Sequence, residues 1–350
     1  MAGRLPGLSI AVVGTEGIRW LAGLGLADLA SRAPATPETI YLWFSMTKIV
    51  TATVVLQLAD QGQLALDDPV AHHYPPFASL RPSERAGRAT LRHLLSHSAG
   101  LANPIPVRWV HPADRSGPDP ASFIARLLAK HPKLRFEPGA KASYSNLGFL
   151  ILGQVVEAVS GRRFQDHVHE AVLQPLGMGH TNFTYPADPA PVATGYQRRR
   201  STMTPLLRIL LPSGILASKQ DGYRSFHRFY VDGPAYGGLV GPVRDAARFL
   251  QMHLRDGELD GTRILSVDSA VAMRQITTMG RRFDLGLGWF RPAKRRTQTP
   301  AFVQHRGDGG AFATDMRMYP EASLGLVMMG NATSYDRDQI ATLLAQRWSR

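Results

Sequence analysis

Hydrophobic and polar residues are spaced in two different ways along this chain, and the difference predicts where strands and helices lie. Near the N-terminus, the apolar runs 8–13 and 18–22 are separated by a turn between Gly14 and Gly17, which predicts a β-hairpin. Late in the chain, apolar or alternating runs recur between turns at 285–290, 302–305, 314–319 and 324–330. These four runs are typical of strands in one antiparallel sheet.

The remaining apolar segments have the length and spacing of helices. Residues 45–61 are apolar on nearly all sides and end before Gly62, which predicts a buried helix. Further helices are expected at 90–97, 121–130, 147–160, 163–173, 243–256 and 336–348. The proline-rich stretch 102–120 is expected to be an irregular loop.

The order of these elements favours an α+β fold to which both chain ends contribute. We expect an α/β domain from residues 1–40 and 236–350, with an antiparallel sheet flanked by helices. An inserted helical domain would occupy residues 41–235. Within it, residues 197–230 mix basic and apolar side chains in an atypical way.

Composition narrows the class of protein. A chain of 350 residues with 44% hydrophobic residues can build a large core, and the absence of cysteine excludes disulfides and a cysteine nucleophile. No apolar run reaches the roughly 18 residues that a membrane-spanning helix needs. The N-terminus does not resemble a signal peptide. The sequence as numbered therefore predicts a cytoplasmic protein, or a periplasmic or secreted one if a signal peptide was removed.

The formal charge of +13 suggests an acidic partner, but its distribution argues against nucleic acid. The 34 arginines are spread along the whole chain, without zinc-finger spacing or an aromatic RNA-binding signature. We therefore expect no nucleic-acid partner. Only 6 lysines occur, and Lys48 is the only one in the first 129 residues.

That lysine belongs to the motif Ser45-Met-Thr-Lys48 at the start of the predicted buried helix. Two residues three apart share one helical face, so the lysine nitrogen can reach the serine hydroxyl. A buried lysine with a lowered pKa can accept a proton, which an arginine cannot do. Such a pair predicts an activated serine nucleophile, although the spacing alone also arises by chance.

Two further groups of residues could carry chemistry. Tyr144-Ser145-Asn146 precedes the predicted helix 147–160, so the tyrosine could act as general base, or Ser145 or Asn146 could simply cap the helix. His305-Arg306-Gly307 ends a predicted strand and leads into Asp308 and two glycines. Glycines at a strand end let backbone N–H groups approach a ligand closely, as an oxyanion hole requires.

His93 and His97 have the i, i+4 spacing of metal ligands on a helix. No glutamate stands between them and no third ligand is evident, so we interpret both as hydrogen-bonding residues of the helix and the loop after it. We predict neither a metal nor a cofactor.

In this order along the chain, Ser-x-x-Lys, Tyr-x-Asn and His-x-Gly resemble the serine β-lactamase and penicillin-binding-protein superfamily. The resemblance is strongest to the class C β-lactamase and family VIII carboxylesterase branch. Supporting stretches are 6–13, 91–101, 136–148 and 236–239, so it covers nearly the whole chain. It implies a mixed sheet-and-helix domain plus a helical domain, with the active site between them.

The resemblance also implies a role for each motif residue. Ser45 would be the acylated nucleophile, Lys48 its proton partner, and Tyr144 the general base that also protonates the leaving group. Asn146 would contact the acyl side of the substrate. The backbone N–H groups of Ser45 and Asp308 would form the oxyanion hole.

The chain departs from the family pattern in two places. His305-Arg306 stands where β-lactamases and transpeptidases have Lys-Thr, which helps to hold the substrate carboxylate. Arg306 could replace this lysine in part only if its side chain faces the site. His305, Gly307 and Asp308 are the other residues expected to contact the substrate in this region. Second, residues 197–230 match no clear family feature. We interpret them as a helix packed on the domain, or else as an acyl-chain lid or a peripheral membrane contact through residues 198–228.

Together these features predict a serine hydrolase that works through an acyl-enzyme on small-molecule esters or amides, in first place short-chain carboxylic esters. The alternatives are a β-lactamase, a D-Ala-D-Ala carboxypeptidase, a D-aminopeptidase or an acyltransferase. A remote alternative is an inactive relative that serves as a membrane-associated binding protein. The sequence does not indicate an oligomeric state.

Overall fold

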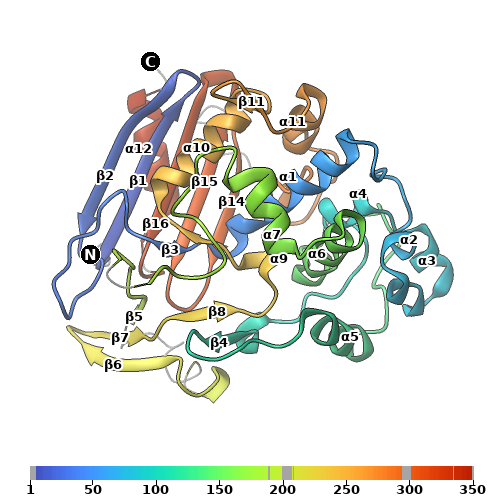
Figure 1. The fold of residues 1–350 in the computed structure, drawn as a ribbon, viewed down its shortest axis with the longest axis horizontal. Helices are drawn as coiled ribbons and strands as arrows, with labels where there is room; N and C mark the ends of the chain where they lie inside the picture. The colour runs from blue at the N-terminus through green and yellow to red at the C-terminus, as the bar shows by residue number, and fades with distance from the viewer. Residues whose placement is uncertain are drawn as a thin grey trace.

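A seven-stranded antiparallel sheet joins the two ends of the chain (Figure 1). The computed structural model describes residues 5–187, 190–198, 207, 209–293, 301–333 and 335–348. The strand order is β12-β13-β14-β15-β16-β1-β2, so the N-terminal hairpin pairs directly with the last strand. The strands are β1 (Gly7–Gly14), β2 (Gly17–Gly25), β12 (Phe283–Leu285), β13 (Phe290–Pro292), β14 (Val303–Asp308), β15 (Ala313–Tyr319) and β16 (Leu324–Gly330).

Helices cover both faces of this sheet. On one face, Leu8, Ile10 and Val12 of β1 share a core with residues of α12 (Arg337–Trp348). On the other face, Ala11 and Val13 belong to the main core, which includes α10 (Val243–Leu254). A strand that is buried on both faces favours apolar residues at nearly every position, which explains why five of the six residues in 8–13 are apolar. The exception, Ser9, is buried and hydrogen-bonded to the Thr36 carbonyl oxygen and the Tyr41 hydroxyl.

The helical part is built around α1 (Thr47–Asp60), which is buried along most of its length. It packs against α6 (Asn146–Ser160), α9 (Pro234–Gly237) and α11 (Val267–Arg274). The other helices are α2 (Val70–His73), α3 (Ser83–Arg88), α4 (Leu91–Leu95), α5 (Pro120–Lys130) and α7 (Phe164–Val168), which continues into a π-helix at His169–Leu173. The smaller strands are β3 (Tyr41–Leu42), β9 (Val240–Gly241), β10 (Glu258–Leu259) and β11 (Thr262–Arg263).

Most of the predicted elements are confirmed, but the predicted strand 285–290 is wrong. Leu285 ends β12 and pairs with Phe290 at the start of β13, and residues 286–289 form the turn between them. Gly288 has a φ of +91°, which favours glycine, and a Cβ on Gly286 would lie 2.5 Å from the Met273 carbonyl oxygen. The two glycines therefore let an apolar run fold back on itself, with Leu287 and Trp289 buried.

The stretch 102–120 and the segment 197–230 also contain more regular structure than the sequence suggested. A 3₁₀ turn at Pro106–Arg108 leads into β4 (Val110–Pro112), which pairs with β8 (Phe229–Val231). Strands β5 (Tyr196–Arg198), β7 (Tyr223–Phe226) and β6 (Leu216–Gln220) form a three-stranded sheet. The predicted basic helix is thus wrong for most of 197–230. The part of it at 199–206 and 208 lies outside the described residues.

In the described ranges, no helix has both the length and the apolar character to cross a membrane. The division into domains at 40/41 and 235/236 remains a prediction, although strands from 7–25 and 283–330 do share one sheet.

Candidate active site

Ser45 lies in a strained turn at the entrance to α1. It belongs to the 3₁₀ turn Phe44–Met46, which leads directly into the helix. Phe44 has a φ of +48°, a conformation that costs a residue with a side chain roughly 1–3 kcal/mol. Packing holds this conformation, because the Phe44 ring contacts those of Phe229 and Phe312. Strain that packing maintains is a frequent property of catalytic turns.

The side chain of Lys48 reaches Ser45 as the three-residue spacing predicted. Lys48 Nζ donates hydrogen bonds to Ser45 Oγ at 2.9 Å and to the Tyr236 carbonyl oxygen at 2.7 Å. The side chain is fully buried, and this burial lowers the pKa of Lys48 well below its ordinary value. In the part of the chain that the structure describes, no carboxylate is paired with it. Burial therefore shifts Lys48 toward its neutral form.

Tyr144 approaches the same hydroxyl from another element. Its hydroxyl donates to Ser45 Oγ at 2.8 Å, and burial raises its pKa above the ordinary value. The ring lies 4.4 Å, between centroids, from the ring of His97. Ser145 accepts from the Gly148 N–H as the N-cap of α6, so the capping interpretation is confirmed for Ser145 while Tyr144 beside it faces the nucleophile.

His97 has a supporting position that the sequence did not reveal. Its Nδ1 accepts the Ser145 backbone N–H at 3.1 Å, and its ring also lies 5.0 Å from that of Phe149. Burial, with a smaller contribution from the nearby Lys48, lowers the pKa of His97 well below its ordinary value. A neutral imidazole thus holds both the ring of Tyr144 and the backbone after it.

Asn146 and His305 complete the polar end of the site. Asn146 is buried, and its Oδ1 has no hydrogen-bond partner in the described structure. His305 Nδ1 lies 3.0 Å from the Arg306 carbonyl oxygen, and its ring contacts those of Phe290 and Tyr144. Burial is the main cause that lowers the pKa of His305 to about 3. His305 is therefore neutral at physiological pH.

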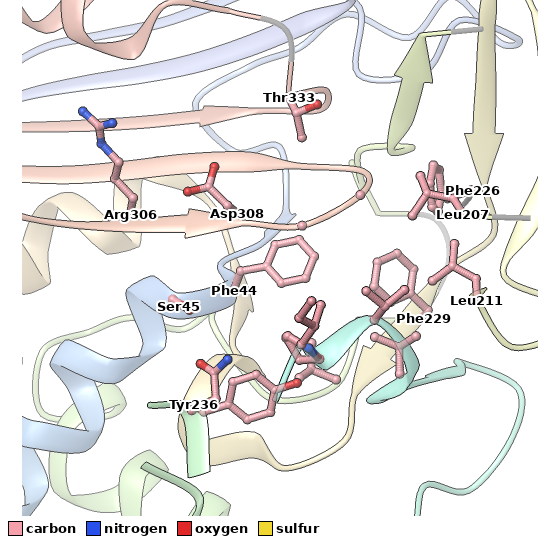
Figure 2. A pocket seen from close by; sticks show the side chains of 18 of the residues that line it. Phe44, Ser45, Leu207, Leu211, Phe226, Phe229, Tyr236, Arg306, Asp308 and Thr333 are labelled. Carbon is pink, nitrogen blue, oxygen red and sulfur yellow. The ribbon is translucent and has the colours of Figure 1, made fainter. Parts of the chain in front are cut away.

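Arg306 does not turn its side chain toward Ser45. Figure 2 shows this side chain pointing away from Ser45. Its guanidinium pairs with Asp338 of α12 and with Asp315 of β15, behind the sheet. The Asp308 carboxylate likewise pairs with Arg337 at 2.6 Å. Arg306 could replace a carboxylate-binding lysine only if its side chain faced the site, and this condition is not met, because neighbouring residues of a strand point to opposite faces.

Gly307 allows β14 to approach the serine turn. A Cβ at this position would lie 2.1 Å from the Trp43 carbonyl oxygen and 2.2 Å from Thr314 Oγ1. Only glycine permits that distance, and the close approach brings the backbone of Asp308 to the turn that carries Ser45.

A cavity of about 690 Å³ opens in front of Ser45 (Figure 2). Its polar end contains Ser45, Tyr144, Asn146 and His305, and backbone or side-chain atoms of Arg306 and Asp308 border it. The rest of the wall is largely apolar and comes from several elements: Phe44, Ile105, Val107, Val110, Leu207, Leu211, Ile215, Phe226, Phe229, Val231, Phe283 and Phe290.

The two histidines with metal-ligand spacing have other partners. The Thr90 N–H donates to His93 Nδ1 at 3.1 Å at the start of α4, and His97 supports Tyr144 as described above. Over the described ranges, no group of three or more potential ligand side chains could hold a metal ion.

This fold, with a serine that accepts hydrogen bonds from a lysine and a tyrosine, is that of the serine β-lactamases and penicillin-binding proteins. The chain belongs to the Beta-lactamase family, whose model matches residues 1–347. The family resemblance and the fold class expected from the sequence are thus confirmed, and the family comprises serine hydrolases.

Individual relatives are similar over most of the chain. "Penicillin-binding protein 4" of Amycolatopsis lactamdurans is 28% identical over 98% of this chain and 86% of its own length. The D-alanyl-D-alanine-carboxypeptidase/endopeptidase AmpH of Escherichia coli K12 is 27% identical over 80% of this chain and 68% of its own. The octameric penicillin-binding protein homologue from Pyrococcus abyssi superposes with a TM-score of 0.79 at 26% identity, over 98% of this chain and 73% of its own.

Proposed function

We propose that this protein is a carboxylesterase in which the substrate acylates Ser45 and water then hydrolyses the acyl-enzyme. The observation that carries the proposal is the convergence of Lys48 Nζ and the Tyr144 hydroxyl on Ser45 Oγ, at 2.9 and 2.8 Å. A serine hydroxyl is a weak nucleophile unless a neighbouring base takes its proton. An inactive binding protein would have no need for a buried, uncompensated lysine at this point.

The two shifted pKa values suggest how protons move during acylation. Neutral Lys48 takes the proton of Ser45 while Oγ attacks the ester carbonyl carbon, and the oxyanion is held by the backbone N–H groups of Ser45 and Asp308. Tyr144, which burial keeps protonated, gives its proton to the departing alkoxide as the ester C–O bond breaks. The acyl-enzyme then holds a lysinium beside a tyrosinate.

Deacylation reverses these transfers. The Tyr144 oxyanion takes a proton from a water molecule, and the resulting hydroxide attacks the acyl carbon. When the tetrahedral intermediate collapses, Lys48 returns its proton to Ser45 Oγ and the carboxylic acid leaves. Every proton and bond is then accounted for, and both catalytic side chains return to their neutral resting forms.

The motif His305-Arg306-Gly307 favours ester substrates that carry no carboxylate. His305 is neutral, and the Arg306 guanidinium is bound behind the sheet. Neither side chain thus offers a cation to a substrate carboxylate, whereas substrates of β-lactamases and D-Ala-D-Ala carboxypeptidases carry one. Asn146 lines the cavity and its Oδ1 has no hydrogen-bond partner among the described residues, which supports a neutral hydrogen bond from its amide to the substrate.

The test is hydrolysis of p-nitrophenyl butyrate, with nitrocefin measured alongside. We expect ester hydrolysis that is lost in Ser45→Ala, and slow or absent nitrocefin hydrolysis. Unchanged ester turnover in purified Ser45→Ala would refute the mechanism.

A D-Ala-D-Ala carboxypeptidase is the second candidate, since the names of two similar relatives point to penicillin binding or to that activity. Release of D-alanine from a peptide ending in D-Ala-D-Ala at a higher kcat/KM than ester hydrolysis would favour it. Location in or outside the cytoplasm remains a prediction to be tested separately.

A further inference from the structure

The cavity in front of Ser45 has its candidate catalytic side chains at one end, and the rest of its wall is mostly apolar, with Gln197 and Thr333 as further polar lining residues. Of the described residues that line it, Arg306 carries the only permanently cationic side chain, and that guanidinium is bound behind the sheet. A path of aromatic contacts leads away from the nucleophile, from Phe44 to Phe229 and from Phe229 to Phe226, each with ring centroids 6.2 Å apart. An apolar group attached to Ser45 could thus extend along apolar side chains.

The far wall comes from the segment that the family resemblance did not explain. The Leu211 N–H donates to the Leu207 carbonyl oxygen at 2.9 Å, which places these two side chains on one face of a helical turn. Both line the cavity, whereas Ile209 between them points outward and is 73% exposed. Arg108 Nε donates to the Leu210 carbonyl oxygen at 3.1 Å and ties this turn to the Pro106–Arg108 turn.

We propose that this cavity binds an aliphatic acyl chain longer than butyryl, and that Leu207 and Leu211 limit the chain length. The inference rests on the proposed function. The substrate that it names has a longer acyl chain than the short-chain esters expected from the sequence. The acyl group stays on Ser45 through both half-reactions, while the alcohol must leave after the first. The apolar part of the cavity therefore suits the acyl group better than the alcohol.

The first experiment compares substrates on the wild-type protein. Each methylene of the acyl chain that is buried on binding can raise kcat/KM by up to about fourfold. We therefore expect kcat/KM for p-nitrophenyl octanoate to exceed that for the acetate by at least about tenfold. Ethyl octanoate and octyl acetate are isomers that differ only in which side of the ester carries the long chain. We expect the wild type to prefer ethyl octanoate by a similar factor.

The second experiment changes the wall. Leu211→Trp adds bulk inside the cavity, and Ile209→Trp adds the same bulk on the exposed side of the same turn. We expect Leu211→Trp to lower the octanoate-to-acetate ratio of kcat/KM at least about tenfold. Ile209→Trp should keep the wild-type ratio. Because the readout is a ratio within one variant, a partial loss of folded protein does not affect it.

Each result supports or overturns the inference. It is overturned if kcat/KM falls steadily from acetate to octanoate, if octyl acetate is hydrolysed as well as ethyl octanoate, or if the two tryptophan variants have the same ratio. The proposed esterase function survives all three results, provided that acetate hydrolysis still requires Ser45. If no ester of any length is hydrolysed, the proposed function fails and the inference fails with it.

Discussion

Replacing Lys48 tests whether the site needs a group that can lose its proton. Lys48→Arg keeps a long cationic side chain but cannot supply a neutral base, because arginine stays protonated in proteins. Lys48→Met keeps most of the apolar length and removes the nitrogen. Lys130→Arg, at the exposed end of α5, makes the same lysine-to-arginine change away from the site.

The expected magnitudes follow from the surroundings of Lys48. Proton transfer by a positioned side chain contributes about 10²–10⁴-fold to a rate, so both substitutions should lower kcat at least about 100-fold. Lys48→Met also leaves the Tyr236 carbonyl oxygen without its lysine donor, which should cost about 1–3 kcal/mol of stability. Lys48→Arg should be less stable than Lys48→Met, since it places a permanent charge where no carboxylate pairs with it.

Stability as a function of pH gives an independent measure of the same group. Burial lowers the folded-state pKa of Lys48 below the ordinary 10.5, so below pH 10.5 the unfolded chain binds more protons at this position than the folded chain. The free energy of unfolding of the wild type should therefore rise with pH relative to Lys48→Met. The expected slope is up to about 1 kcal/mol per pH unit between pH 8 and 10.

Urea unfolding at several pH values and p-nitrophenyl butyrate hydrolysis are the two assays. Lys130→Arg should match the wild type in both. If Lys48→Arg retained activity within about threefold of the wild type, Lys48 would not be the proton acceptor. A flat or falling stability difference between pH 8 and 10 would show that Lys48 remains charged in the folded protein.

Three other substitutions give direct expectations. Tyr144→Phe removes the hydroxyl that contacts the nucleophile and should lower kcat at least about 100-fold, whereas the control Tyr74→Phe should keep the wild-type kcat. Equal kcat values for Tyr144→Phe and the wild type would exclude proton transfer by Tyr144. Gly307→Ala places a Cβ 2.1 Å from the Trp43 carbonyl oxygen, so we expect lower activity and a lower Tm, and a fully active variant would contradict the close approach. Arg306→Gln should leave ester kcat/KM within about threefold, because its guanidinium is bound behind the sheet; a loss of 100-fold would mean that it acts in the site.

Sequence patterns predicted the sheet and the long helices because their causes are local. The apolar run 8–13 and the buried helix that became α1 each follow from the periodicity of neighbouring residues. The pairing of β4 with β8 joins residues more than 100 positions apart, and no local pattern indicates it. The run 285–290 was misinterpreted as a strand because apolar residues also bury themselves in turns when glycines allow the backbone to bend.

The sequence predicted those contacts of the candidate site that are made by residues close together in one element. It did not predict contacts between residues that distant elements bring together. Ser45 and Lys48 are brought together by one helical turn, so their contact followed from the motif. The place of His97 beside Tyr144 depends on how α4 and α6 pack, which the sequence does not reveal. The apolar wall formed by Leu207 and Leu211 likewise depends on where the segment after β5 lies in the fold.

The sequence alone indicates that His305 and Arg306 face opposite ways, and the orientation of Arg306 bears directly on the proposed substrate class. If residues 302–306 form a strand, His305 and Arg306 must point to opposite faces, and only one of them can face Ser45. Gly307 fixes which one, because its lack of a side chain is needed on the face that meets the Trp43 carbonyl oxygen, and His305 shares that face. The arginine then has to find carboxylates behind the sheet, which Asp315 and Asp338 provide. With a neutral histidine in front and a compensated arginine behind, neither of these two residues offers a cation to a substrate, which supports the proposal that the preferred esters carry no carboxylate.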